Sequence, residues 1–227
     1  MSRGEEVQRV AVRTAIEIAT AGLGLAGPVG ALVAASIKPA LELVAVREGR
    51  GMQNIADVVT GVREATGLSP EEFGQWAGSS DGRLMLATSA FQAANNTMHE
   101  GKVKALAAVL AEGINDDAKL DLSLLIVAAL TDLEAAHIRV LDAMVNTNSD
   151  AHIAYPDVEG NRWPSSILEG RFPGLRSGIA PIMATLERQG LATRGAPVEN
   201  FRGNQATTWL ATHFGWECLR YLTSTSG

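Results

Sequence analysis

The feature that most constrains the fold is an uncharged run of twenty residues at 18–37, IATAGLGLAGPVGALVAASI. A run of this length just suffices to cross a lipid bilayer as one helix. However, Gly27 and Pro28 stand near its middle, and such a pair is typical of one helix ending and another beginning. We therefore expect an apolar, Gly/Ala-rich helical hairpin within residues 15–47.

Three interpretations of this hairpin remain open. It can be buried in a soluble helical bundle, or it can engage a membrane as a hairpin whose small residues let the two arms approach closely. It can also be a single spanning helix, although the Gly-Pro break favours the buried hairpin over that form. The side chains that would carry membrane engagement or self-association are Leu23, Leu25, Val29, Leu32, Val33 and Ile37.

Composition excludes several classes of protein. Hydrophobic residues make up 46% and charged residues 19% of the 227-residue chain, which is typical of a folded globular protein rather than a disordered one. The formal net charge of −6 argues against a protein that coats nucleic acid. The single cysteine, Cys218, excludes an internal disulfide and a multi-cysteine metal site, and its apolar neighbours predict that it is buried.

The first residues predict an amphipathic helix rather than a signal peptide, because Glu5 and Glu6 precede the apolar run. We therefore expect a cytoplasmic protein. Peripheral or conditional association with the inner face of the membrane is the alternative that the hairpin leaves open.

Downstream of the hairpin, helical patterns and capping signals follow one another. Capping boxes at 69–72 and 131–134 each predict the start of a helix. Apolar spacing predicts further helices over 81–99 and 102–113. Residues 1–130 are therefore expected to form a mainly α helical bundle that includes the hairpin.

No constellation of catalytic or metal-binding residues stands out. Asp116, Asp117 and Asp121 lack the alternating ligands, the glycine and the final glutamate of a calcium loop. Glu134 and His137 form a Glu-x-x-His pair, but a di-iron bundle needs a second such pair and two more helical carboxylates. We expect a protein that is not an enzyme and that holds no metal or cofactor.

The C-terminal residues 131–227 follow the order helix, short helix, helix, β-ribbon and helix. The stretches IMATLERQGLATR and WLATHFGWECLRYL resemble the third helix running into the wing, and the strand-to-helix exit, of the winged helix-turn-helix family. This resemblance implies a winged-helix-like α+β domain after the bundle, with its third helix in the DNA major groove. The positions that correspond to the family's nucleic-acid contacts are Arg176, Ser177, Thr185, Arg188, Arg194 and Arg202.

The charge of this C-terminal region weighs against DNA binding. Residues 131–227 hold eight cationic and ten acidic side chains, a net charge of −2, whereas phosphate contacts supply most non-specific affinity for DNA. In addition, Pro181 stands inside the predicted third helix. Docking to another protein is therefore the favoured use of such a domain.

A looser resemblance of pattern involves LMLATSAFQAANNTMHEGKVKALAAVLAEGINDD and LTDLEAAHIRVLDAM, which are similar to the abortive-infection alpha group of bacterial proteins. The resemblance implies a non-enzymatic effector in phage defence. We therefore expect a bacterial binding or effector protein that acts through helical self-association or through membrane engagement by the hairpin. The alternative is a winged-helix DNA-binding transcriptional regulator. The expected partner is a second copy or another protein, with a membrane next and nucleic acid less favoured.

Overall fold

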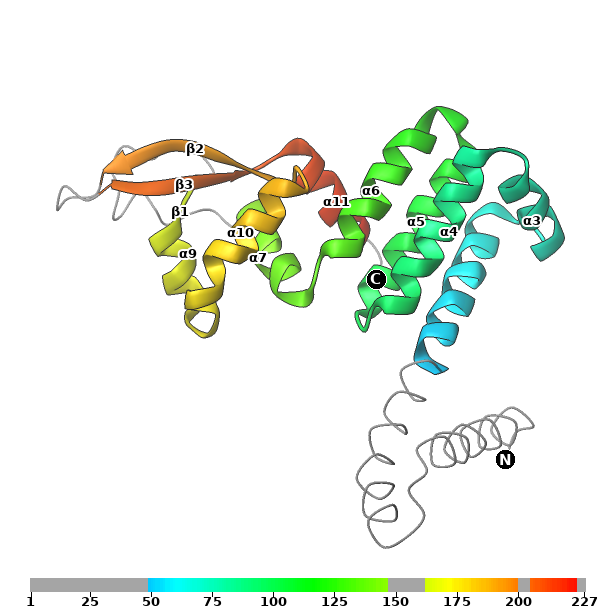
Figure 1. Cartoon of the computed structure of the whole chain (residues 1–227), viewed down its shortest axis with the longest axis horizontal. Coiled ribbons are helices and arrows are strands. Elements are labelled where there is room, and N and C mark those ends of the chain that lie inside the picture. Colours follow the sequence, from blue (N-terminus) through cyan, green and yellow to red (C-terminus); the bar gives the residue numbers. More distant parts are fainter. Residues whose placement is uncertain (1–48, 147–161, 200–204, 224–227) are drawn as a thin grey trace, which may run out of the picture. The chain divides into compact units, whose positions relative to one another are not determined.

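The structure of the chain is a computed structural model, and residues 49–146, 162–199 and 205–223 are described. Residues 55–227 form one compact unit. Its described part is mainly helical, with a small three-stranded antiparallel sheet towards the C-terminus (Figure 1). The predicted mainly α fold is confirmed at this level. The predicted hairpin at 15–47 lies outside the described residues.

The first described helices are joined by short turns, and the compact unit includes the first of them only from residue 55 onward. They are a helix over 49–66, α3 (Pro70–Gly78), α4 (Asp81–Asn96), α5 (Glu100–Asn115), the short 3-10 turn η1 (Asp117–Lys119) and α6 (Leu120–Asp132). α4, α5 and α6 pack against one another, and α3 packs on α4. Their shared core includes Leu86, Leu106, Leu110 and Leu130, all fully buried. The predicted domain boundary between residues 130 and 131 falls inside α6.

The capping box predicted at the start of α3 is confirmed. The Ser69 hydroxyl accepts a hydrogen bond from the backbone N–H of Glu72, and the Glu72 carboxylate accepts one from the backbone N–H of Ser69. Pro70 takes the first helical position, where its missing N–H costs nothing. Local sequence chemistry therefore accounts for the start of this helix.

The second predicted capping box is wrong. Thr131 lies within α6, and its hydroxyl donates to the carbonyl oxygen of Val127 instead of capping a new helix. The next helix, α7 (Ala135–Asn146), begins three residues after Asp132. There the Nδ1 atom of His137 accepts the backbone N–H of Glu134 at 3.0 Å.

The elements after α7 form the three-stranded sheet and the helices that follow or precede its strands. They are β1 (Trp163–Pro164), α9 (Ser165–Arg171), η2 (Pro173–Gly178), α10 (Ile179–Arg188), β2 (Ala192–Glu199), β3 (Gln205–Ala211) and α11 (His213–Thr223). β3 is the central strand and runs antiparallel to both β1 and β2. Trp209 on β3 is paired in register with Trp163 on one side and with Arg194 on the other.

The third helix predicted in residues 131–227, which the sequence pattern places over 175–190, is two elements. Residues up to Gly178 form the 3-10 segment η2, and α10 begins only at Ile179. Pro181 therefore stands in the first turn of α10, where backbone N–H groups have no intrahelical partner. The proline shifts the start of the α-helix rather than breaking its interior.

The last helix, α11, packs against α5, α6 and α7. The Tyr221 hydroxyl donates to the Glu112 carboxylate on α5 at 2.7 Å. At Gly215, a Cβ atom would lie 2.1 Å from the carbonyl oxygen of Leu191, so only glycine permits this approach. Cys218 is buried, as predicted. Among the described helices, none has the length and apolar character needed to cross a membrane.

A candidate docking groove between α4 and α6

An open groove of about 800 Å³ lies on the helical part. It runs between α4 and α6, two helices that point in the same direction because α5 turns back between them (Figure 1). Gly82 of α4 lies against Leu120 of α6 near one end of the groove, and Asn96 and Asp132 line its other end. The groove therefore follows most of the length of both helices.

The lining residues repeat with the same spacing on the two helices. α4 contributes Met85, Ser89, Gln92 and Asn96. On α6, the matching set is Asp121, Leu125, Ala128 and Asp132, and Leu124 and Thr131 line the groove beside it. Each set follows i, i+4, i+7, i+11, the spacing of side chains along one helical stripe. Eleven residues correspond to about 16 Å of helix. Two parallel stripes of this kind form the holes into which the side chains of a third helix can insert.

One end of the groove is apolar and exposed. The side chains of Met85 and Leu125 are 58% and 61% exposed, respectively, and the half-buried Leu124 lies beside them. The neighbouring Leu84 is also an exposed large hydrophobic residue. Large apolar side chains that gather on a surface are typical of an interaction site, whereas single ones need no explanation.

The other end is polar, with Gln92, Asn96, Thr131, Asp132 and Gln189. The Asp132 carboxylate accepts a hydrogen bond from the Gln189 side chain at 2.5 Å and pairs with Arg188 at 3.4 Å. Both ionic partners are well exposed, so this pair contributes little stability. It does, however, connect the end of α6 to the end of α10.

Lys102 of α5 lies behind this polar end and is only 3% exposed. Its Nζ atom donates to the carbonyl oxygen of Leu133 at 2.8 Å and to that of Thr131 at 3.3 Å. Burial lowers the pKa of Lys102, and the carboxylates of Glu134 and Asp132 partly oppose that change. The ammonium thus sits at the C-terminal end of α6, where a helix favours positive charge.

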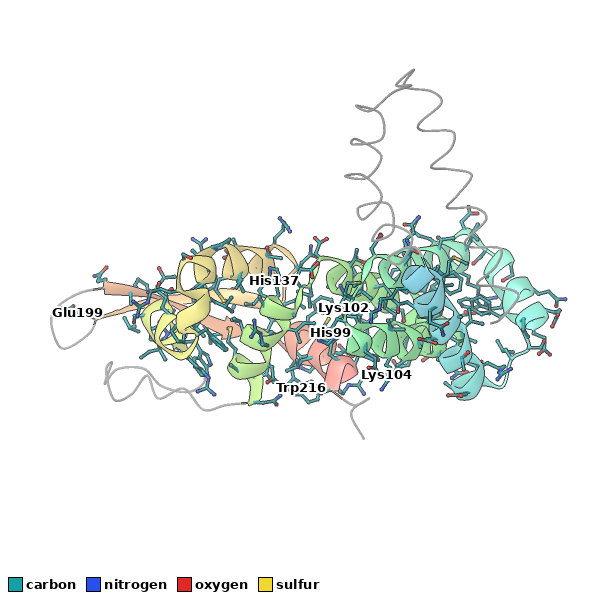
Figure 2. All side chains as sticks on the ribbon, turned by 90° about the horizontal axis from the view of Figure 1, so that it is seen from below. His99, Lys102, Lys104, His137, Glu199 and Trp216 are labelled. Atoms are coloured by element: carbon teal, nitrogen blue, oxygen red, sulfur yellow. The ribbon has the colours of Figure 1, made fainter. Side chains whose placement is uncertain are left out.

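His137 lies close to Lys102 at the start of α7 (Figure 2). Burial lowers the pKa of His137, while the nearby carboxylates of Glu134 and Asp132 partly raise it. Its Nδ1 atom is already used by the backbone N–H of Glu134, so the imidazole has a structural partner. Across the described ranges, no three acidic, histidine or cysteine side chains gather as a metal site would require.

The residues predicted to contact nucleic acid are distributed over η2, α10 and β2. Arg176 and Ser177 are exposed on η2, and Thr185 is half-buried on α10. Arg188 pairs with Asp132 at the end of α10. Arg202 lies outside the described residues.

Arg194 on β2 is also engaged. It pairs with Glu187 at 3.1 Å, and its guanidinium lies over the ring of Trp209 at 5.3 Å from the centroid. The exposed face of α10 between the arginines carries Ala180, Pro181 and Ala184. This face offers small side chains rather than base-reading donors or acceptors.

A smaller cavity of about 260 Å³ lies between α9, α10 and the sheet. Met183 and Trp209 form part of its wall, and Arg194 stands at its edge. The Trp209 indole N–H donates to the Ser165 hydroxyl at 3.1 Å, and that hydroxyl donates to the carbonyl oxygen of Thr207. The indole N–H of Trp209 and the Ser165 hydroxyl are thus hydrogen-bonded within the protein.

The sequence hypotheses did not include the α4–α6 groove. Its signal was present as the two i, i+4, i+7, i+11 sets. However, the α4 set mixes apolar, hydroxyl and amide residues and the α6 set mixes apolar and acidic residues, so neither resembles a hydrophobic stripe. The six hairpin residues from Leu23 to Ile37 lie outside the described residues. The groove is therefore the best-defined candidate site.

Comparison of the chain with protein-family models, with curated proteins and with solved structures gave no match. The function of the groove has to be inferred from its own residues.

Proposed function

We propose that this chain is a non-enzymatic binding protein that takes a helical segment of a partner protein into the groove between α4 and α6. The observation that carries the proposal is the pair of matched stripes, with Met85 and Leu125 exposed at one end. An amphipathic helix that lays its apolar face into a groove is a recurrent mode of recognition between proteins.

The dimensions support this choice. The groove is about 16 Å long, which matches three turns of an α-helix. Ala128, near the middle of the α6 stripe, leaves room for the backbone of an incoming helix to approach. At the polar end, the amides of Gln92, Asn96 and Gln189 can donate and accept hydrogen bonds with partner side chains.

The experiment places a photo-crosslinking amino acid at Ser89 in the full chain, in cells of its source. We expect a discrete adduct that is lost when Leu125→Asp is added. A synthetic helical peptide covering the crosslinked segment should then bind the purified protein and lose that binding with Leu125→Asp. Leu125 is exposed, so the change should leave the fold intact, as circular dichroism would check.

Met98→Asp is the matched control, because Met98 is 68% exposed but does not line the groove. This variant should keep both the adduct and the peptide affinity. Equal loss in the two variants, or a crosslinked segment that does not bind as a helix, would overturn the proposal.

The winged-helix resemblance leads to a second proposal, a transcriptional regulator. The exposed Arg176, which has no ion pair among the described residues, favours it, whereas the pairing of Arg188 and Arg194 with acids weighs against it. Salt-dependent DNA binding that weakens in Arg176→Ala and Arg188→Ala would support it. DNA binding unaffected by these changes, or absent, would remove it.

The uncharged run at 18–37 supports a third proposal, in which the hairpin engages a membrane or self-associates, as in a phage-defence effector. Liposome co-flotation and dye release with the full chain would test it. Binding that is weakened by Leu32→Asp or Val33→Asp would support it, and no binding by the parent chain would remove it.

A further inference from the structure

We infer that the helix accepted by the α4–α6 groove carries lysine or arginine at both ends of its apolar stripe. This inference rests on the proposed docking function and specifies the chemistry of the partner.

The charged residues that line the groove are all acidic. Asp121 stands at one end of the α6 stripe and Asp132 at the other, and no lysine or arginine is among the lining residues. The Asp121 carboxylate has no ion pair or hydrogen bond among the described residues. A helix that enters this groove therefore meets, at the Asp121 end, a carboxylate whose charge is balanced only by the N-terminus of α6, and a cation there is favoured.

The polarity of the lining changes along the groove. At the Asp121 end, the partner's cation would stand next to the apolar contacts of Met85 and Leu125, where partial loss of water strengthens an ion pair. At the Asp132 end, Arg188 already shares the carboxylate at 3.4 Å. The cation at the Asp121 end should therefore contribute more than the one at the Asp132 end.

The same charges disfavour a symmetric contact between the α6 stripes of two copies of this chain. If the α6 stripes of two copies met in parallel, Asp121 would face Asp121 and Asp132 would face Asp132. If they met antiparallel, Asp121 would face Asp132. Either arrangement opposes carboxylate to carboxylate, and the Arg188 that pairs with Asp132 at 3.4 Å offsets this repulsion only in part. A separate partner with basic residues matches the groove better.

A display library of helical peptides tests the inference even while the partner is unidentified. Each peptide carries Leu and Ala at i, i+4 and i+7, with the flanking positions randomised over Lys, Arg, Gln, Asp and Glu. Selection uses the full-length chain, and counter-selection uses the Leu125→Asp variant. We expect Lys and Arg to be enriched over Asp and Glu at both flanks.

Binding measurements on the synthesised winners then locate the charge effect. Asp121→Asn should weaken binding about two- to fivefold at low salt, the range expected for one partly exposed ion pair. The difference should shrink as salt is raised. Glu64→Gln is the control, because Glu64 is an exposed acid outside the groove, and it should leave affinity unchanged. A thermal melt of each variant checks the fold.

The outcomes separate this inference from the function on which it rests. Winners that need Leu125 but show no preference for basic flanks, or that are unaffected by Asp121→Asn, overturn the inference and leave helix docking standing. A selection that yields no Leu125-dependent winner overturns both.

Discussion

Lys102 Nζ on α5 donates to the carbonyl oxygen of Leu133 at 2.8 Å, just beyond the end of α6. The ammonium is almost fully buried, so this contact replaces water at the point where the chain turns from α6 into α7. One side chain of α5 thereby holds the junction between two later helices. Figure 2 shows Lys102 and His137 together at this junction, whereas Lys104 lies towards the outside.

We expect Lys102→Met to lower the free energy of unfolding by about 1–3 kcal/mol, because it leaves the carbonyl oxygens of Thr131 and Leu133 buried without a donor. Lys104→Met is the control. Lys104 is half exposed and pairs only with Glu100 at 3.2 Å, so its loss should cost less than about 0.5 kcal/mol. Urea titrations of the three proteins make the comparison, and equal effects would contradict the role given to Lys102.

The same residue predicts a pH dependence. Folding lowers the pKa of Lys102 from its ordinary value of 10.5, so the unfolded chain binds the proton more tightly. The stability of the parent protein relative to Lys102→Met should therefore rise as the pH increases through the folded pKa towards 10.5. Urea titrations at pH 7 and pH 9.5 would measure the difference, and a fall would contradict the prediction.

The stabilisation that the Glu112 carboxylate contributes should be lost in acid. Burial raises the pKa of Glu112, but the hydrogen bonds from Tyr221 and Lys119, together with the charges of Lys119 and Arg220, outweigh burial and lower it overall. The stabilisation is therefore fully present above the unfolded pKa, near 4.5, and is lost as the pH falls through the folded value. Glu112→Gln should cost about 1–2 kcal/mol at pH 7. That cost should shrink towards zero at pH 3, and a constant difference in urea titrations would contradict the prediction.

Substitution by alanine should have opposite effects on stability at two of the glycines. Gly215→Ala would bring Cβ to 2.1 Å from the carbonyl oxygen of Leu191, and we expect a loss of about 3 kcal/mol or more. Gly74→Ala in α3 meets nothing within 4 Å and should stabilise the protein by about 0.5–1 kcal/mol. Thermal melts of both variants test the prediction, which fails if the two shifts have the same sign.

The thiol of Cys218 should be unreactive in the folded protein. Burial raises the pKa of Cys218 to about 12, and the charge of Glu217 adds to that effect. Its thiolate fraction at pH 8 is then about a thousandfold below that of a free cysteine. A thiol reagent should label the native protein only as fast as it unfolds, and full labelling within minutes in buffer would contradict this. Labelling in urea provides the positive control.

Short-range sequence signals predicted part of this fold. The side chains of Ser69 and Glu72 each accept a hydrogen bond from the backbone N–H of the other residue, all within four positions. Their pattern alone therefore predicted the start of α3. Thr131 and Glu134 carry the same pattern, but α6 continues through Thr131 because its apolar face remains packed in the core, and the cap is overridden. The sequence pattern predicts a longer helix with Pro181 in its interior, whereas Pro181 stands in the first turn of the shorter helix that forms.

The groove and the burial of Lys102 could not be predicted in the same way. Met85 and Leu125 are forty residues apart and become neighbours only because α5 reverses the chain between α4 and α6. Lys102 resembles any other lysine on a helix until the carbonyl oxygens of Thr131 and Leu133 are placed next to it. Both features depend on tertiary packing and not on spacing within one helix.

The contact between Tyr221 and Glu112 joins residues 109 positions apart. At roughly 5–20 residues per second, ribosomes need roughly 5–20 s to synthesise the chain between them. During that interval α5 has already emerged, but the helix that covers one of its faces does not yet exist. The nascent chain therefore exposes an apolar surface until α11 is released, and chains that stop before it should be bound by chaperones or aggregate.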